Sequence, residues 1–308
     1  MHRYWRRLIP IAISGAVLIW LVSRFRIAPG DVLRSISLRE LSGLALALAA
    51  YGAFGLWVES LSLMRALSGR STLTSLRAAA RIKAASYLAF IVHYSVGMGA
   101  QTYLLRRRAG VEIWFAAGVV AMLSGFDLVG LLLAAGTASV FAADPPVAAA
   151  VPLTLGSCGL GAVVLLRWSG GPEPLVRFRD WPIFAAIGGC GGRELVEAAA
   201  LRFALMGSYF AFAAGTVAIF GIPVSLADSV SKMTAVALIA ALPIAAAGLG
   251  TSQAAFLLLF SSYAPPEKLL ACSLAMTLGL ITLRVAIGLV FAREYARESI
   301  EAQEEMSL

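Results

Sequence analysis

The chain has 308 residues, of which 60% are hydrophobic and 14% are charged, whereas soluble domains are typically about 45–50% apolar and about 25% charged. Its mean hydropathy is +0.84. A soluble globular fold is excluded, because so few charged side chains cannot cover a body of this size in water. The hydrocarbon of a membrane is therefore the expected solvent.

The net charge of +8 arises from 22 arginines and only three lysines on the basic side. These bases stand beside apolar runs instead of forming one basic domain, which argues against nucleic-acid binding and favours anionic lipid head groups as partners. Three cysteines and two histidines are scattered along the chain without metal-ligand spacing. We expect no metal site, no disulfide framework and no cofactor.

The first apolar run, residues 8–22, follows three arginines and is not followed by a small-x-small cleavage site. This pattern predicts a first span entered from the cytoplasm and not a cleaved signal peptide. Residues 31–40 carry two arginines among aliphatic residues at near-helical spacing, which predicts a short amphipathic helix on the membrane surface.

Five further segments are long and apolar enough to cross a bilayer, at about 20 residues per span. The stretches between them at 65–83 and 167–193 contain several bases, so the positive-inside rule places both in the cytoplasm. The five predicted spans are residues 41–64, 113–143, 147–166, 194–222 and 269–292.

Two uncharged segments are expected to break. Residues 84–105 have basic clusters at both ends and contain Gly97-Met98-Gly99, and a re-entrant hairpin at these glycines keeps both clusters in the cytoplasm. Residues 233–266 as one helix would be about 51 Å long, well beyond a hydrocarbon core of about 30 Å. We expect a break from Pro243 to Gly250, which gives either two spans or a second re-entrant hairpin.

These features predict an all-α polytopic membrane protein with about 6 to 8 transmembrane helices, two broken or re-entrant segments and a potential inverted-repeat architecture. We expect one integral membrane domain over residues 1–308, in a bacterial inner membrane, with both termini in the cytoplasm. Its halves are residues 1–168 and 182–295, joined by a cytoplasmic linker at 169–181 and followed by an acidic cytoplasmic tail at 296–308.

The two glycine breaks carry a resemblance to a known family. Residues 94–110 (Tyr-Ser-Val-Gly-Met-Gly-Ala-Gln-Thr-Tyr-Leu-Leu-Arg-Arg-Arg-Ala-Gly) are similar to its glycine-rich break, acidic residue and Leu-Leu-Arg-Arg-x-Gly exit. Residues 242–253 (Leu-Pro-Ile-Ala-Ala-Ala-Gly-Leu-Gly-Thr-Ser-Gln) are similar to its proline, Gly-Leu-Gly and acidic-residue element. From residue 5 to residue 295 the chain resembles the transmembrane, flippase-like region of lysylphosphatidylglycerol synthases and their stand-alone relatives.

This resemblance implies a module that translocates or binds an anionic, glyco- or isoprenoid-derived lipid. The chain departs from the family at Gln101 and Gln253, where an acid is common, and no proline precedes Gly97. An amide can hydrogen-bond a head group but carries no charge. The short stretch after the last span leaves no room for an aminoacyl-transferase domain, so we expect no lysyl transfer.

Charges inside the spans are functional candidates, because each costs about 2.5–3.5 kcal/mol at the bilayer centre on insertion scales. Asp127 lies half-way along its span and is expected to pair with Arg284, either structurally or at a substrate. Arg202 lies deep enough to meet a lipid phosphate. The candidate substrate path is Gly97, Gly99, Gln101, Asp127, Arg202, Gly248, Gly250, Gln253 and Arg284.

Four further residues are candidate anchors or relays. Glu59 is expected to pair with the basic stretch that follows its span, and His93 is expected to make a helix contact more readily than to relay protons. Glu194 and Glu197 share a helix face and are expected to meet interfacial bases, with Arg177, Arg179 and Arg193 as the candidates. Lys232 is expected to snorkel to the membrane interface.

No catalytic order of Ser, His and Asp, no paired-carboxylate spacing and no phosphate loop has a credible context, so we expect no enzymatic activity. The leading hypothesis is a flippase-like protein that moves or binds lipid. The alternatives are a small-solute secondary transporter and a non-transporting scaffold of a membrane biosynthetic complex. The expected partners are membrane lipids, with a second copy of the chain or lipid-biosynthesis enzymes as further candidates.

Overall fold

The computed structural model describes residues 15, 17–68, 70–73, 75–92, 94–141, 146–167, 181, 183–241 and 249–305. The regular elements in this part of the chain are all α-helices. Five of its helices are long and apolar enough to cross a membrane: 38–66, 113–141, 150–167, 192–219 and 266–291. The predicted all-α polytopic fold and its five long spans are confirmed, whereas the first predicted span, 8–22, lies mostly outside the described residues.

The region predicted as one amphipathic helix, residues 31–40, is divided between two helices. Helix α2 (Pro29–Arg34) ends within this region, and α3 (Leu38–Ala66) begins a few residues later, still within it. The Ser37 hydroxyl accepts from the Glu40 N–H at 3.2 Å, and the Glu40 carboxylate accepts from the Ser37 N–H at 2.6 Å. The prediction of one continuous helix is wrong, because this capping box starts a new helix.

The first broken segment forms two short helices, α4 (Leu76–Val92) and α5 (Tyr94–Ala109), which pack against each other. The predicted break is confirmed, but its predicted position at Gly97 and Gly99 is wrong, since both glycines lie within α5. A Cβ at Gly97 would overlap the Phe90 ring. Gly97 therefore allows α5 to lie close to α4 and does not end a helix.

Helices α6 (Ile113–Phe141) and α7 (Pro146–Arg167) follow as two spans packed against each other. The short α9 (Ala185–Gly189) leads to the long α10 (Gly192–Ile219), and Gly221 follows the end of α10 with a positive φ of 61°. The predicted linker at 169–181 lies, except for Trp181, outside the described residues.

The second broken segment forms α11 (Leu226–Ala241) and α12 (Thr251–Phe260), which also pack against each other. The predicted break is confirmed at its described end, because Leu249 and Gly250 are not helical and α12 begins at Thr251. Gly250 precedes α12 with a φ of 89°, a backbone conformation that favours glycine. Pro243 and Gly248 lie outside the described residues. Helix α13 (Pro266–Glu305) is the last element.

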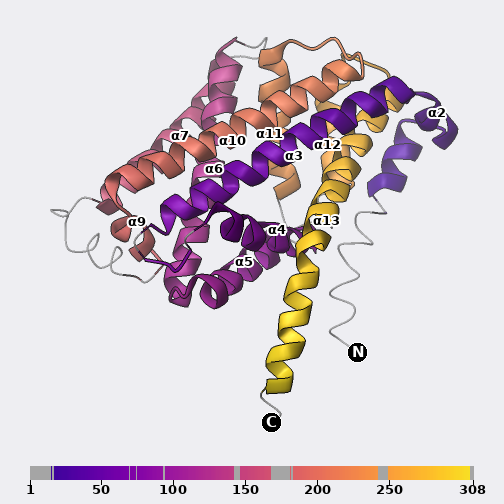
Figure 1. Cartoon of the computed structure of the whole chain (residues 1–308). Helices are drawn as coiled ribbons and strands as arrows, with labels where there is room; N and C mark the ends of the chain where they lie inside the picture. The colour runs from indigo at the N-terminus through magenta and orange to yellow at the C-terminus, as the bar shows by residue number, and fades with distance from the viewer. Residues whose placement is uncertain are drawn as a thin grey trace, which may run out of the picture.

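The two halves repeat one order of elements with opposite orientation. A long helix is followed by a short helix pair and another long helix: α3, α4–α5 and α6, then α10, α11–α12 and α13. Helices α3 and α10 lie side by side (Figure 1) and are antiparallel, because Gly43 meets Ile219 while Arg65 meets Glu197. Helix α6 packs on α11, and α13 correspondingly packs on α4. This reciprocal arrangement is that of two inverted repeats.

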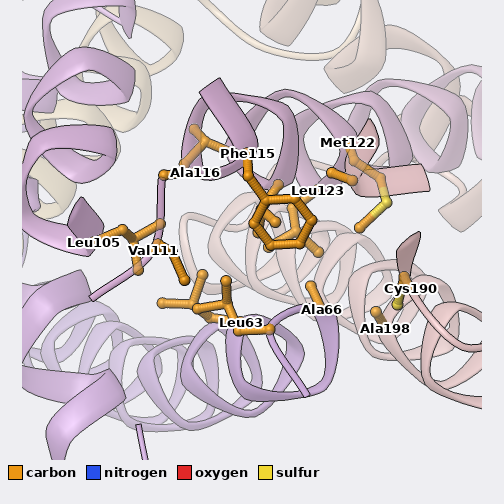
Figure 2. Close-up of a cluster of buried hydrophobic side chains, with 14 of the residues drawn as sticks. Leu63, Ala66, Leu105, Val111, Phe115, Ala116, Met122, Leu123, Cys190 and Ala198 are labelled. Carbon is orange, nitrogen blue, oxygen red and sulfur yellow. The ribbon is translucent and has the colours of Figure 1, made fainter. Parts of the chain in front are cut away.

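Two hydrophobic cores lie at opposite ends of the α3–α10 pair. The first gathers residues of the α4–α5 pair and α6 around Leu63 and Leu123 (Figure 2). The second gathers residues of α11, α12 and α13 around Phe256 and Phe260, whose rings stack 4.4 Å apart. Each short helix pair is thus held by its own core, and the middle of the α3–α10 pair lies between the two.

Gly118 of α6 allows the close approach of the turn before α9, because a Cβ there would overlap the Ile183 carbonyl oxygen. We expect Gly118→Ala to lower the free energy of unfolding by about 1–3 kcal/mol, the usual range for overpacking. Gly125→Ala on the same helix is the control, since a Cβ there meets nothing within 4 Å. Thermal unfolding in detergent measures both variants, and equal midpoints would contradict the prediction.

Candidate functional site

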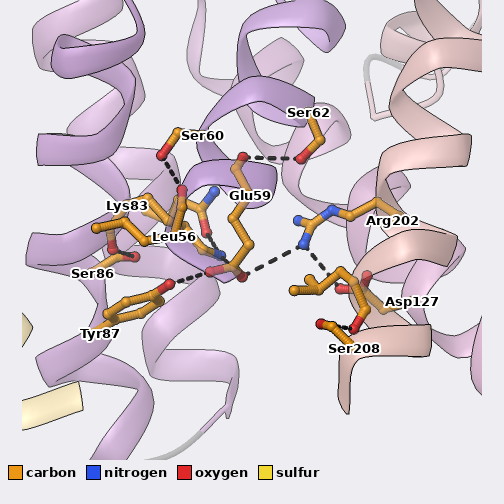
Figure 3. Close-up of polar contacts among 12 residues, drawn as sticks. Leu56, Glu59, Ser60, Ser62, Lys83, Ser86, Tyr87, Asp127, Arg202 and Ser208 are labelled. Atoms are coloured by element: carbon orange, nitrogen blue, oxygen red, sulfur yellow. Dashed lines mark hydrogen bonds and ion pairs between the residues drawn. The ribbon is translucent and has the colours of Figure 1, made fainter. Parts of the chain in front are cut away.

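Four charged side chains meet between the two cores, in a cluster that we call the central charge cluster: Glu59, Lys83, Asp127 and Arg202. They come from α3, α4, α6 and α10, so both repeats contribute (Figure 3). Asp127 is the middle residue of α6, which places the cluster deep in the hydrocarbon core. Two acids and two bases balance in formal charge.

Glu59 is the acid on which the two bases converge. Its Oε1 lies 3.0 Å from Lys83 Nζ and 3.5 Å from Arg202 Nη1. Tyr87, one helical turn after Lys83, donates its hydroxyl hydrogen to Oε2 of the same carboxylate. The predicted anchoring of Glu59 by the basic stretch 65–83 is therefore confirmed in part, since Lys83 belongs to that stretch. However, Lys83 is buried within α4 and not placed in a loop.

Arg202 joins the two repeats through two acids. Its Nη1 also lies 3.3 Å from Asp127 Oδ2, and its side chain is only 3% exposed. The Nε and Nη1 groups nevertheless make no hydrogen bond in the described part of the chain, nor does Asp127 Oδ1. Buried polar groups are normally hydrogen-bonded, so Arg202 Nε and Asp127 Oδ1 offer a donor and an acceptor to a ligand group, whereas Nη1 already faces two carboxylates.

Gln101 connects the α4–α5 pair to the cluster. Its Oε1 accepts a hydrogen bond from Lys83 Nζ at 3.1 Å, and both side chains are buried. The Lys83 ammonium also lies 5.0 Å from the centre of the Phe90 ring, a distance at which a cation is attracted to an aromatic face. The amide therefore helps to hold the lysine that faces Glu59.

Gln253, predicted as the counterpart of Gln101, has a structural role at the second break. Its side chain is fully buried, its Oε1 accepts from the Gly250 N–H at 2.6 Å, and its Nε2 donates to the Thr277 hydroxyl at 3.1 Å. These bonds cap α12 and attach it to α13. Among the described residues, no hydrogen bond joins Gln253 or Gly250 to the central charge cluster. Two other candidate residues, His93 and Gly248, lie outside the described residues.

The expected ion pair between Asp127 and Arg284 is wrong. Arg202 of α10 reaches Asp127 instead, because α6 packs directly against α10. Helix α13 packs along α4 and α3, and Arg284 is exposed on it. In the described part of the chain no ion pair of Arg284 is found.

At the surface end of the same helix pair, Glu197 pairs with Arg65 at 2.9 Å and with Arg193 at 2.8 Å. The predicted interfacial pairing of Glu197 is confirmed for Arg193, whereas Arg177 and Arg179 lie outside the described residues. Glu194 lies in the first turn of α10. The Lys232 ammonium lies 5.9 Å from the centre of the Tyr263 ring.

Sequence reasoning missed Lys83 and Tyr87 as members of the site. Lys83 ends a run of bases that reads as a cytoplasmic loop, but α4 begins seven residues earlier. The spacing of four residues between Lys83 and Tyr87 was a usable signal, since it places both on one helix face.

The chain matches no protein-family model and no curated protein sequence. The functional argument therefore depends on the geometry of the central charge cluster.

We expect Glu59→Gln to lower the free energy of unfolding by about 3–5 kcal/mol, because it leaves a buried lysine without its anion. Glu197→Gln removes an acid from half-exposed pairs on the same α3–α10 interface, where each pair contributes about 1 kcal/mol or less. Denaturation in detergent compares the two variants. A similar loss for both would show that the cluster is not energetically distinct.

Proposed function

We propose that this protein is a membrane transporter that translocates lipid by receiving an anionic head group at the central charge cluster. The observation that carries this proposal is the state of Arg202, which is buried, flanked by two acids and, among the described residues, without a hydrogen bond on Nε or Nη1. A guanidinium suits the oxygens of a phosphate, because its donors form a planar fork.

A purely structural role for the cluster is less consistent with this geometry. A buried ion pair stabilises a fold only when additional hydrogen bonds satisfy the remaining polar atoms. Within the part of the chain that the structure describes, Arg202 Nε, Arg202 Nη1 and Asp127 Oδ1 lack them. A phosphate that enters would compete with Glu59 and Asp127 for Arg202. When no ligand is bound, Glu59 and Asp127 balance the charges of the two bases. When a phosphate binds Arg202, the two acids lose their ion pairs with it.

Because the ion pairs join the two repeats, competition for Arg202 would also weaken the contact between them. Arg202 belongs to the second repeat, whereas Glu59 and Asp127 belong to the first. A head group that replaces the acids removes two ion pairs between the repeats. Since a ligand shifts a conformational equilibrium by its differential affinity for the two states, binding at Arg202 would favour reorientation of one repeat against the other. Such movement about a midplane site is the usual basis of alternating access.

The resemblance to the flippase-like region of lysylphosphatidylglycerol synthases supports the same proposal from the sequence. We extend the proposal to a non-enzymatic protein of a bacterial inner membrane, with both termini in the cytoplasm. Its substrate class is an anionic, glyco- or isoprenoid-derived lipid. The scaffold hypothesis differs in assigning the interior charges to folding alone.

A small-solute secondary transporter is the second candidate function, and Asp127 favours it. The Asp127 carboxylate is 24% exposed and its Oδ1 has no hydrogen bond in the described part of the chain. An interior carboxylate of this kind is the usual carrier of a proton in a transporter. The same cluster would then bind a water-soluble anion together with a proton.

The lipid hypothesis predicts that Arg202→Gln slows translocation of fluorescent phosphatidylglycerol in proteoliposomes at least tenfold. Loss of hydrogen bonds to a charged group, about 1.5–3 kcal/mol, corresponds to roughly 10–100-fold. Dithionite quenching of the outer leaflet measures the rate. Arg193→Gln is the control, because Arg193 is 86% exposed at the end of the same helix. An unchanged rate in folded Arg202→Gln would favour the scaffold hypothesis.

Asp127→Asn separates the two transport hypotheses. We expect it to abolish substrate uptake driven by a pH gradient if the protein is a proton-coupled solute transporter, since an amide cannot carry the proton. Lipid translocation measured without a gradient should persist in the same variant, because the Arg202 guanidinium remains. The two assays are run on one reconstituted preparation. Gradient-driven uptake that survives in Asp127→Asn would contradict the proton-coupled role.

A further inference from the structure

Arg284 is a cation within the membrane-spanning part of α13, outside the central charge cluster. The residue before it, Leu283, packs on Gly52, which is the middle residue of α3, so Arg284 lies at the depth of the hydrocarbon core. Its side chain is exposed, and among the described residues it forms no ion pair. A charge at this depth is unfavourable unless an opposite charge faces it.

Two tyrosine hydroxyl groups lie at the same level, where α13 packs on α3 and α10. Tyr51 precedes Gly52 on α3, and its ring stacks on Phe212 of α10 at 5.1 Å. Tyr209 is three residues before Phe212 and therefore lies on the same face of α10. The Arg284 guanidinium is within electrostatic range of both tyrosines. In the part of the chain that the structure describes, neither hydroxyl has a hydrogen-bond partner.

The described acids of the neighbouring helices are paired already or lie far from this level. Those of the central charge cluster face its two bases. Helices α4 and α12 contain no acid, and Asp31 of α2 faces Arg34. The other acids of α3, α10 and α13 are ten or more residues away along their helices, about 15 Å or farther: Glu40, Glu194, Glu197, Glu267, Glu294 and those that follow it.

Tyr87 of α4 connects this level to the central charge cluster. Its hydroxyl donates to Glu59 Oε2, and the Arg284 guanidinium is within electrostatic range of it as well. The next residue of α4, Leu88, packs on Gly288, one turn after Arg284. Polar groups therefore continue from Arg284 on α13 to the acid that pairs with Arg202.

From this arrangement we propose that Arg284, Tyr51 and Tyr209 form a second phosphate-binding site, which holds the head group of a lipid on its way to or from Arg202. The planar donors of a guanidinium fit two phosphate oxygens, and a tyrosine hydroxyl donates to a third. Because Arg284 is exposed at hydrocarbon depth, a lipid in the bilayer reaches it from the side. This role rests on the proposed function, since only a head group in transit passes this depth.

Native mass spectrometry of protein released from mixed phosphatidylglycerol and phosphatidylcholine nanodiscs counts the bound lipids. We expect Arg284→Gln to lower the occupancy of one phosphatidylglycerol per chain at least tenfold, because it removes charged hydrogen bonds. Arg39→Gln is the control, since Arg39 is also exposed but lies at the start of α3. Tyr51→Phe keeps the ring that stacks on Phe212 and should lower the same occupancy roughly 2–10-fold.

A binding role also predicts that Arg284→Gln folds as well as the unmodified chain, because the substitution breaks no ion pair among the described residues. Thermal unfolding in detergent checks this. Equal phosphatidylglycerol occupancy in Arg284→Gln and Arg39→Gln would overturn the site. If Arg284→Gln does not fold, the double variant Tyr51→Phe and Tyr209→Phe takes its place, and unchanged occupancy in it would overturn the site.

Arg202→Gln separates this site from the proposed function. We expect this variant to retain the lipid at Arg284 while its translocation slows. Normal translocation in Arg202→Gln, together with lipid loss in Arg284→Gln, would contradict the proposed function and support the site. Radiolabelled inorganic phosphate added to delipidated protein tests for a soluble anion. Phosphate binding that Arg284→Gln removes, with unchanged phosphatidylglycerol occupancy, would overturn the assignment to lipid.

Discussion

A charge can remain in the hydrocarbon core only when an opposite charge or a hydrogen-bond partner faces it. Glu59 meets this requirement for two bases at once, since Lys83 and Arg202 both approach its Oε1. These contacts fix the depth of α4 against α3 and the register of α3 against α10. The packing of the first core around Leu63 follows from that register, because Leu63 lies one turn beyond Glu59 on α3. The ion pairs thus determine where apolar surfaces can meet.

The inverted repeats make this arrangement possible with few charges. Antiparallel packing of α3 on α10 brings an acid in the second half of α3 opposite a base in the first half of α10. The reciprocal packing of α6 on α11 and of α13 on α4 encloses the α3–α10 pair from both sides. The Lys83 and Arg202 side chains are only 6% and 3% exposed, so their ion pairs act in a medium of low polarity, where they are strong.

Long apolar helices were predictable because hydropathy over about 20 residues reports directly on the membrane environment. The five spans and the two broken segments follow from it. Partner choice was not predictable, because it depends on which helices become neighbours. Asp127 meets Arg202 and not Arg284 since α6 packs on α10. The break predicted at Gly97 and Gly99 was wrong for a similar reason. Both glycines lie within α5, where Gly97 allows close packing on α4. In membrane helices, small residues such as glycine are common where two helices pack closely.

The two buried glutamines show how the repeats divide their tasks. Gln101 faces Lys83 and therefore belongs to the polar centre, whereas Gln253 caps α12 and binds Thr277. An acid at position 101 would form a second ion pair with Lys83 and weaken its hold on Glu59, whereas the neutral amide supports the lysine and leaves Glu59 available to Arg202. The first repeat thus supplies the acids and the supporting polar groups, and the second supplies the guanidinium. A symmetric fold carries asymmetric chemistry, so a head group that binds Arg202 meets acids on one side only, and its entry separates the repeats at a defined interface.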